Sequence, residues 1–281
     1  MSDLDTLFER LRSRRWEARK AAAKAMVSAG APAVKYLTKA LSDDNPDLRL
    51  IAAKALGWVG SPAAVTPLVG ALADEDAGVR KVAAEALGRT GNVGAVAPLI
   101  LALMDDDWSV REAAAEALGC IGDASAVTPL VGLLKDKYLD VREAAAEALA
   151  RIGQPAVASL IAALGDQQPD VRFCAAEALG KIGNPQSIAP LINAVGDHDP
   201  GVRRVAIEAL GRMGDPQAIP AVVGALADES SSVRYAAAVV LGKIGDSSVL
   251  GRLGEASKDK NSGVRVAALK AMSAIELRSR S

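Results

Sequence analysis

Histidine, cysteine and aromatic residues are scarce in this sequence. Its 281 residues include one histidine, His198, and two cysteines, Cys120 and Cys174. So few soft ligands argue against a zinc site and a disulfide framework, and we expect a cytoplasmic protein with no metal and no cofactor. Aromatic residues make up only 3% of the chain. They offer few flat walls for a cofactor, and no catalytic residue is predicted.

A charge excess of one sign and long apolar runs are also missing. Lys and Arg number 33 against 34 Asp and Glu, so the formal net charge is −1, whereas dedicated nucleic-acid binders usually carry a strong basic excess. No apolar run reaches the roughly 18 residues of a membrane-spanning helix, and the first residues lack the apolar stretch of a signal peptide. We therefore expect neither a nucleic acid nor a membrane as partner.

What the sequence does contain is an internal repeat. A Val-Arg pair recurs with its arginine at positions 80, 111, 142, 172, 203, 234 and 265. Leu48-Arg49 and Ala18-Arg19 extend the series backwards, so nine units at intervals of 30 or 31 residues cover nearly the whole chain. Self-similarity at such a period is typical of stacked repeat architectures.

Each unit predicts a pair of antiparallel helices. In the unit that starts at residue 60, the segment 64–73 has apolar residues at 65, 68, 69 and 72, the spacing of an amphipathic helix. A polar turn at 74–78 leads to a second helix from Val79 to about Thr90, and Gly91 is the expected left-handed residue that ends it. One pair is too small to cover its own apolar face, so we predict that neighbouring pairs stack.

The resulting fold class is an all-α, right-handed α-solenoid of nine stacked helix pairs. We predict one domain over 1–281, with an N-terminal capping repeat at 1–30, seven internal repeats at 31–245 and a C-terminal capping repeat at 246–281. The first helix is expected at 2–13. The last helix is expected at 264–277, followed by a basic tail.

The repeated motif D-x(5)-R-x-x-A-A-x-A-L-G-x-I-G resembles the HEAT-repeat superfamily, and in particular the short repeats called phycobilisome-lyase HEAT-like. Ankyrin is the alternative suggested by Thr66-Pro67-Leu68, but the period of 31 and the missing histidine disfavour it. Tetratricopeptide repeats are disfavoured because their Trp and Tyr positions are absent. HEAT-repeat iron hydroxylases use His-Glu pairs, and the absence of any such pair here excludes that activity.

An aspartate stands six residues before the arginine in every unit except the first, which has Ser13. The resemblance implies that these residues form a hydrogen-bonded ladder between neighbouring units, and a forked Arg donor suits a carboxylate. The predicted ladder comprises Asp43, Arg49, Asp74, Arg80, Asp105, Arg111, Asp136, Arg142, Asp166, Arg172, Asp197, Arg203, Asp228, Arg234, Asp259 and Arg265.

The positions +1, +5 and +9 after each repeated arginine share one face of the second helix, which we call the groove stripe. In related solenoids this stripe lines the concave surface. Several units carry Glu at +5 and Arg or Lys at +9, a favourable intrahelical ion pair. Large apolar residues interrupt the pattern and are the candidate binding residues, although aromatics there could also simply fill space: Leu50, Trp58, Phe173, Tyr235 and Val239.

A second candidate surface is the rim formed by the turns between the two helices of a unit. Trp108 and the pair Tyr138-Leu139 fall at nearly the same place in adjacent units. They form either a contact patch or a packing pair on the flanking turn. His198 occupies the equivalent turn of a later unit, where we expect it to cap the helix or face solvent.

These patterns favour a noncatalytic scaffold, a monomer or weak homodimer, that binds a protein or peptide in its groove. This partly follows from the fold, because solenoids bind many unrelated partners. The alternative is a lyase-type or chaperone-like helper of a tetrapyrrole-bearing protein, as the family resemblance suggests. Nucleic-acid binding along the helix ends is disfavoured by the net charge and by the lack of an aligned basic row.

Overall fold

A computed structural model describes residues 3–280, which form eighteen α-helices and nine short 3-10 helices and contain no strand. The α-helices alternate between first helices of six to nine residues and second helices of fourteen to nineteen. The prediction of an all-α solenoid of nine helix pairs is confirmed. No helix among the described residues is long and apolar enough to cross a bilayer.

Two compact units divide the chain, residues 1–152 and 153–281, and each is described by itself. The expectation of one continuous domain with two capping repeats stays a prediction. The first unit contains α1 (Asp3–Leu11), α2 (Trp16–Ala29), α3 (Val34–Ala40), α4 (Pro46–Val59), α5 (Val65–Ala71), α6 (Ala77–Thr90), α7 (Val96–Ala102), α8 (Trp108–Ile121), α9 (Val127–Leu133) and α10 (Leu139–Ile152).

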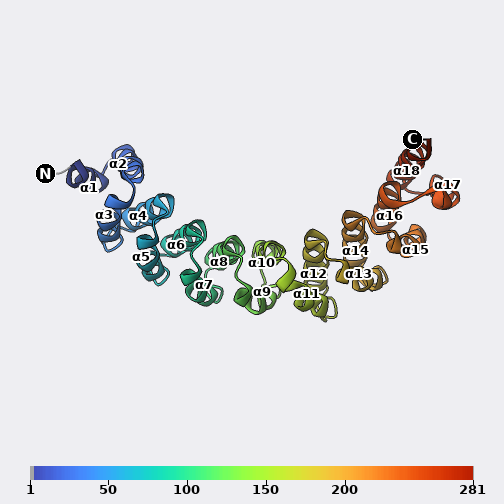
Figure 1. The fold of residues 1–281 in the computed structure, drawn as a ribbon, viewed down its shortest axis with the longest axis horizontal. Coiled ribbons are helices and arrows are strands. Elements are labelled where there is room, and N and C mark those ends of the chain that lie inside the picture. The colour runs from blue at the N-terminus through green and yellow to red at the C-terminus, as the bar shows by residue number, and fades with distance from the viewer. Residues whose placement is uncertain (1–2, 281) are drawn as a thin grey trace. The chain divides into compact units, whose positions relative to one another are not determined.

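The second unit repeats the same arrangement. It contains α11 (Val157–Ala163), α12 (Pro169–Ile182), α13 (Ile188–Ala194), α14 (Pro200–Met213), α15 (Ile219–Gly224), α16 (Ser231–Ile244), α17 (Leu250–Ala256) and α18 (Ser262–Arg280). Within each unit the second helices lie side by side in one layer, and the first helices form another (Figure 1).

Local caps move the helix ends by a few residues from their predicted positions. The expected helix at 64–73 is a 3-10 turn (Pro62–Ala64) followed by α5, because the Ser61 side chain accepts a hydrogen bond from the Ala63 amide and starts the turn separately. The second helix begins at Ala77 rather than Val79, since Asp76 caps it by accepting from the Val79 amide. Gly91 ends this helix in the left-handed conformation, at φ 62°.

The terminal helices also differ from the expectation. The predicted helix at 2–13 is α1, which ends at Leu11, and Ser2 lies outside the described residues. The last helix begins at Ser262 and extends to Arg280, so it includes most of the predicted basic tail. Arg278 explains part of this extension, because its guanidinium donates to the Gly242 and Gly245 carbonyls at 2.7 and 2.8 Å.

Small residues allow the second helices to pack closely. A Cβ added at Gly119 would lie 2.7 Å from the Ala148 Cα of the neighbouring second helix, and Gly88 meets Ala117 in the same way. Leucines from both layers fill the remaining space and are completely buried, for example Leu68, Leu87, Leu99, Leu118 and Leu130. This packing holds the groove stripe on the outer face of the second-helix layer.

Candidate functional site

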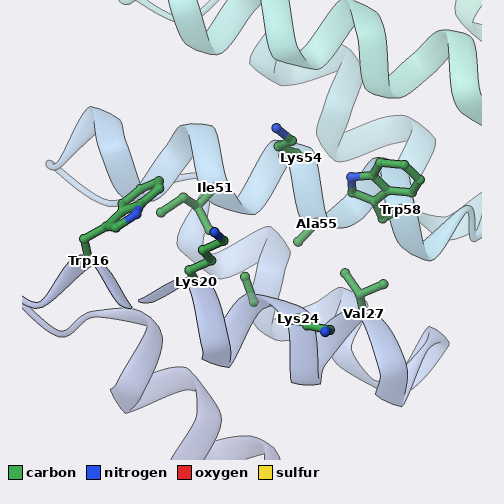
Figure 2. Close-up of a pocket in the computed structure, with 9 residues that line it drawn as sticks. Trp16, Lys20, Lys24, Val27, Ile51, Lys54, Ala55 and Trp58 are labelled. Atoms are coloured by element: carbon green, nitrogen blue, oxygen red, sulfur yellow. The ribbon is translucent and has the colours of Figure 1, made fainter. Parts of the chain in front are cut away.

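One hollow of the first unit lies on the groove stripe between α2 and α4. It has a volume of about 370 Å³, and we call it the Trp pocket; it is lined by Trp16, Lys20, Ala23, Lys24, Val27, Ile51, Lys54, Ala55 and Trp58. The two indoles stand at opposite ends, with Ile51 and Ala55 between them (Figure 2). Trp16 is 52% exposed and Trp58 60%, so both rings are open to a partner.

Cations stand beside both rings. The Arg89 guanidinium lies 4.8 Å from the centre of the Trp58 ring, and the Arg19 guanidinium lies 5.7 Å from that of Trp16. Lys20, Lys24 and Lys54 are exposed at the edge of the hollow. The Trp pocket therefore combines an apolar interior with a positively charged border.

A smaller hollow on the groove stripe of the second unit has similar chemistry. It has a volume of about 250 Å³, and we call it the Tyr pocket; it is lined by Tyr235, Val239, Gly242, Lys243, Val266, Ala267, Lys270, Ala271 and Ala274. Tyr235 is 49% exposed, and Val239 is half-buried. Two of the predicted groove residues therefore lie together in one hollow.

The other two predicted groove residues are covered by their neighbours. Leu50 is half-buried and packs against Ala71, Val79 and Ala83 of the next repeat, so it does not line the Trp pocket. Phe173 is half-buried, and the Arg204 guanidinium lies 5.8 Å from its ring centre. Of the two predicted groove residues on α4, Trp58 lines the Trp pocket and Leu50 does not.

The repeated arginines connect adjacent repeats. Arg111 donates through Nε and Nη2 to both carboxylate oxygens of Asp136, at 2.7 and 3.1 Å, although Asp136 belongs to the next repeat. Its Nη1 donates to the Asp105 and Asp106 carbonyls of its own turn, at 2.7 and 3.1 Å. The same fork joins Arg49 to Asp74, Arg80 to Asp105, Arg172 to Asp197, Arg203 to Asp228 and Arg234 to Asp259.

Burial and hydrogen bonding oppose each other at these carboxylates. Burial alone would raise the pKa of Asp136, but hydrogen bonds from the Arg111 guanidinium and the Tyr138 amide outweigh it and hold that pKa below its usual range. The same balance lowers the pKa of Asp74, Asp105, Asp197 and Asp228. At Asp259 the hydrogen bond from Arg234 is the larger effect, and the pKa is again lowered.

The remaining residues of the series make further contacts. Asp43 accepts from Arg12 at 3.2 Å, while Arg19 donates to Asp47, also at 3.2 Å. Arg142 donates to the Asp136 carbonyl, and Arg265 donates to the carbonyls of Asp259 and Lys260. Asp166 accepts from the Gln168 amide and so caps its turn.

The rim residues form a ring pair. The Trp108 and Tyr138 rings lie 5.8 Å apart at 30°, and the Arg111 guanidinium lies 5.8 Å from the centre of the Tyr138 ring. The exposed fractions are 36% for Trp108, 39% for Tyr138 and 56% for Leu139. Both rings thus use part of their surface in packing, and Leu139 is the more open residue.

The repeats of this chain match a known family. A model of HEAT repeats matches the chain at residues 4–88, 68–150, 96–172, 139–197, 157–238 and 220–280. The chain belongs to the HEAT-repeat family. A comparison with curated proteins gave no match.

Several solved structures are similar to this HEAT-repeat protein. Kap121p is 15% identical over 97% of this chain and 37% of its own, with a TM-score of 0.72. Importin beta is 17% identical over 97% of this chain and 44% of its own, with a TM-score of 0.66. A chain of the phycocyanin lyase CpcE–CpcF complex from Nostoc sp. PCC7120 is 27% identical over 86% and 94%, with a TM-score of 0.46. The first two likenesses show the fold alone.

Several residues of the Trp pocket were not among the sequence candidates of this HEAT-repeat protein. Trp16, Lys20, Lys24 and Ile51 line the hollow, but Trp16 precedes the repeated arginine and so lies outside the groove stripe as defined. One feature of the sequence could have pointed to this pocket. The first two repeats carry Lys at the +5 position, where the next five carry Glu.

The histidine and the two cysteines lie outside the Trp and Tyr pockets. His198 is exposed, Cys174 is buried, and Cys120 is exposed with its Sγ 3.4 Å from Arg151 Nη1. Within residues 3–280, no group of three or more His, Cys, Asp or Glu side chains could hold a metal ion. In the first-helix layer of this HEAT-repeat protein, a shallow hollow of about 480 Å³ lies beside Met104, which is 83% exposed.

Proposed function

We propose that this HEAT-repeat protein is a noncatalytic scaffold that binds a protein or peptide partner on its groove stripe, with the Trp pocket as the main anchor site. The observation that supports the proposal is the pair of half-exposed indoles at the two ends of an apolar hollow. Binding interfaces take most of their energy from a few such aromatic anchors. The Tyr pocket offers a second site of the same kind.

Other parts of the stripe contribute less to this function. Glu147 and Arg151 form an ion pair at 3.3 Å, and Glu177 pairs with Lys181 at the same distance. These side chains already satisfy each other, and exposed pairs contribute little free energy. They give the middle helices of the stripe a polar surface.

Affinity capture from a lysate of the native cell tests the proposal. The bait is the full chain, either wild type or with Trp16→Ala and Trp58→Ala together. We expect the double variant to lose the partner while its far-UV circular dichroism and melting stay close to wild type, since both rings are about half exposed. Truncation of such anchors typically costs about 2 kcal/mol or more of binding free energy.

Trp108→Ala is the matched control, because it removes the same side chain from the rim of the same unit. Capture that is lost with Trp108→Ala and retained with the double variant would place the contact on the rim and contradict the proposal. The alternative role, a lyase-type or chaperone-like helper, predicts a captured partner that carries a tetrapyrrole. The visible absorption spectrum of the captured complex distinguishes the two roles.

A further inference from the structure

The Trp pocket carries positive charge that its own chain does not neutralise. Lys20, Lys24 and Lys54 border the hollow. In the part of the chain that the structure describes, none of these three ammonium groups lies within ion-pair distance of a carboxylate. Lysines can lay their alkyl stems along an apolar wall while the charge stays at the edge. A ligand in the hollow would therefore meet three free ammonium groups.

Beyond α4, cations of the groove stripe in the first unit alternate with carboxylates, and Arg89 on α6 stands beside the Trp58 ring. Lys81 lies 3.9 Å from Glu112, and Arg151 lies 3.3 Å from Glu147. Burial raises the pKa of Glu112, and although Lys81 lowers it, the nearby carboxylates of Glu116, Asp140 and Glu85 raise it further. The stripe is thus cationic at α2 and α4 and acidic at α8.

The interior of the Trp pocket is apolar and therefore favours an apolar group on the ligand. Between the two indoles its lining residues are Ala23, Val27, Ile51 and Ala55, which have no polar side-chain atoms. A volume of about 370 Å³ accommodates a large apolar side chain. Aromatic rings favour such a guest because offset or edge-on contacts add to the burial of apolar surface.

From this combination we infer that the Trp pocket binds an acidic peptide segment of the partner. One large apolar side chain enters the hollow, and carboxylates on either side of it pair with Lys20, Lys24 and Lys54. The inference rests on the proposed function and specifies the chemistry of the partner. Charge complementarity of this kind gives specificity and faster association.

A nucleic acid fits this surface less well than a peptide. Its phosphates would continue along the stripe beyond α4 and reach the carboxylates of Glu112 and Glu116 on α8. A polyanion gains affinity by neutralising a series of phosphates with cations, and beyond α4 the cations of the stripe alternate with carboxylates such as Glu85 and Glu112. A peptide can place its acidic residues at α2 and α4 alone.

Tryptophan fluorescence tests the inference. In a Trp108→Phe background the remaining indoles are Trp16 and Trp58, so the signal reports on the Trp pocket. The probe is a short synthetic peptide with one central phenylalanine flanked by glutamates. We expect saturable binding that weakens about tenfold or more when the glutamates become glutamines or the phenylalanine becomes alanine, because each change removes one half of the recognition.

Charge variants of the protein complete the design. Lys24→Gln with Lys54→Gln should weaken binding of the acidic peptide about tenfold. Lys35→Gln with Lys39→Gln removes the same charge from exposed positions on α3 and should leave the affinity within about twofold. Equal binding of the glutamate and glutamine peptides would overturn the inference. So would oligothymidylate or phosphatidylserine vesicles that bind the pocket in a lysine-dependent manner when the peptide does not.

The two proposals can fail separately. If capture of the native partner needs Trp16 and Trp58 but the affinity for the peptide does not depend on Lys24 and Lys54, the acidic-segment inference is refuted and the proposed function stands. If the peptide binds as expected but native capture does not need the two tryptophans, the proposed function is refuted.

Discussion

Replacing Arg111 with alanine should lower the free energy of unfolding by about 3 kcal/mol. Arg111 links two repeats, because its guanidinium holds the Asp136 carboxylate of the next repeat and two carbonyls of its own turn. The side chains of Arg111 and Asp136 are only 10% and 8% exposed. The substitution therefore removes the charge partner of a buried carboxylate.

The size of this loss depends on the hydrogen bonds that the Asp136 carboxylate retains after the substitution. Removing one partner of a buried ion pair typically costs about 3–5 kcal/mol. Asp136 still accepts a hydrogen bond from the Tyr138 amide at 2.9 Å, which places the estimate at the low end of that range. Arg111→Lys keeps the positive charge but cannot reach both carboxylate oxygens and the carbonyls, so its cost should be about half as large.

Urea unfolding at neutral pH, followed by far-UV circular dichroism, measures these differences. Arg151→Ala is the matched control in the same unit, because Arg151 forms a half-exposed pair with Glu147. Such an i,i+4 pair contributes only about 0.3–0.5 kcal/mol. A loss for Arg111→Ala that is no larger than that of Arg151→Ala would refute the ladder as a stabilising element.

The pH dependence gives an independent check. The folded-state pKa of Asp136 is lowered by Arg111 and the Tyr138 amide, so the unfolded chain takes up its proton first as the pH falls below about 4. The stability from this pair is complete above that pH and is lost as the pH falls through the lowered folded-state pKa. The difference between wild type and Arg111→Ala should therefore shrink in acid, and a constant difference would contradict the electrostatic explanation.

Two further predictions concern the packing of the layers and the cysteines. Gly119→Ala places a methyl group 2.7 Å from the Ala148 Cα and should destabilise the fold by about 1–3 kcal/mol. Gly132→Ala on α9 has no atom within 4 Å of the new methyl group and should stabilise the fold by about 0.5–1 kcal/mol. Melting temperatures of the two variants that shift in the same direction would contradict the close packing of the second helices. A maleimide reagent should modify the exposed Cys120 in the native protein and the buried Cys174 only after unfolding. Native labelling of both cysteines, measured by mass spectrometry, would show that the packing around Cys174 is open.

The sequence by itself determined the architecture of this HEAT-repeat protein. The 30–31-residue period, the apolar spacing and the glycine after every second helix except the last predict the helix pairs to within a few residues. These signals suffice because they are local: amphipathic spacing and a left-handed stop act within one repeat. The caps at Ser61 and Asp76 and the contacts of Arg278 shift individual boundaries.

The partners in the arginine series depend on stacking. Every internal repeat contains the aspartate and the arginine of the motif, and the spacing of the two residues alone, without the family resemblance, does not distinguish pairing within a repeat from pairing between repeats. In the structure Arg80 donates to the backbone carbonyl of its own Asp74 and to the carboxylate of Asp105 in the next repeat. The carboxylate partner therefore comes from the neighbouring repeat, which lies next to Arg80 only once the repeats are stacked.

The candidate site depends on tertiary structure in the same way. Trp58 was visible as a break in the groove stripe, but Trp16 lies 42 positions earlier and in a different register of its repeat. Packing of α2 against α4 brings the two rings to one hollow, while packing of α4 against the next repeat covers Leu50. A local pattern gives the face on which a side chain stands, whereas its exposure depends on the neighbouring helix, whose side chains belong to another repeat.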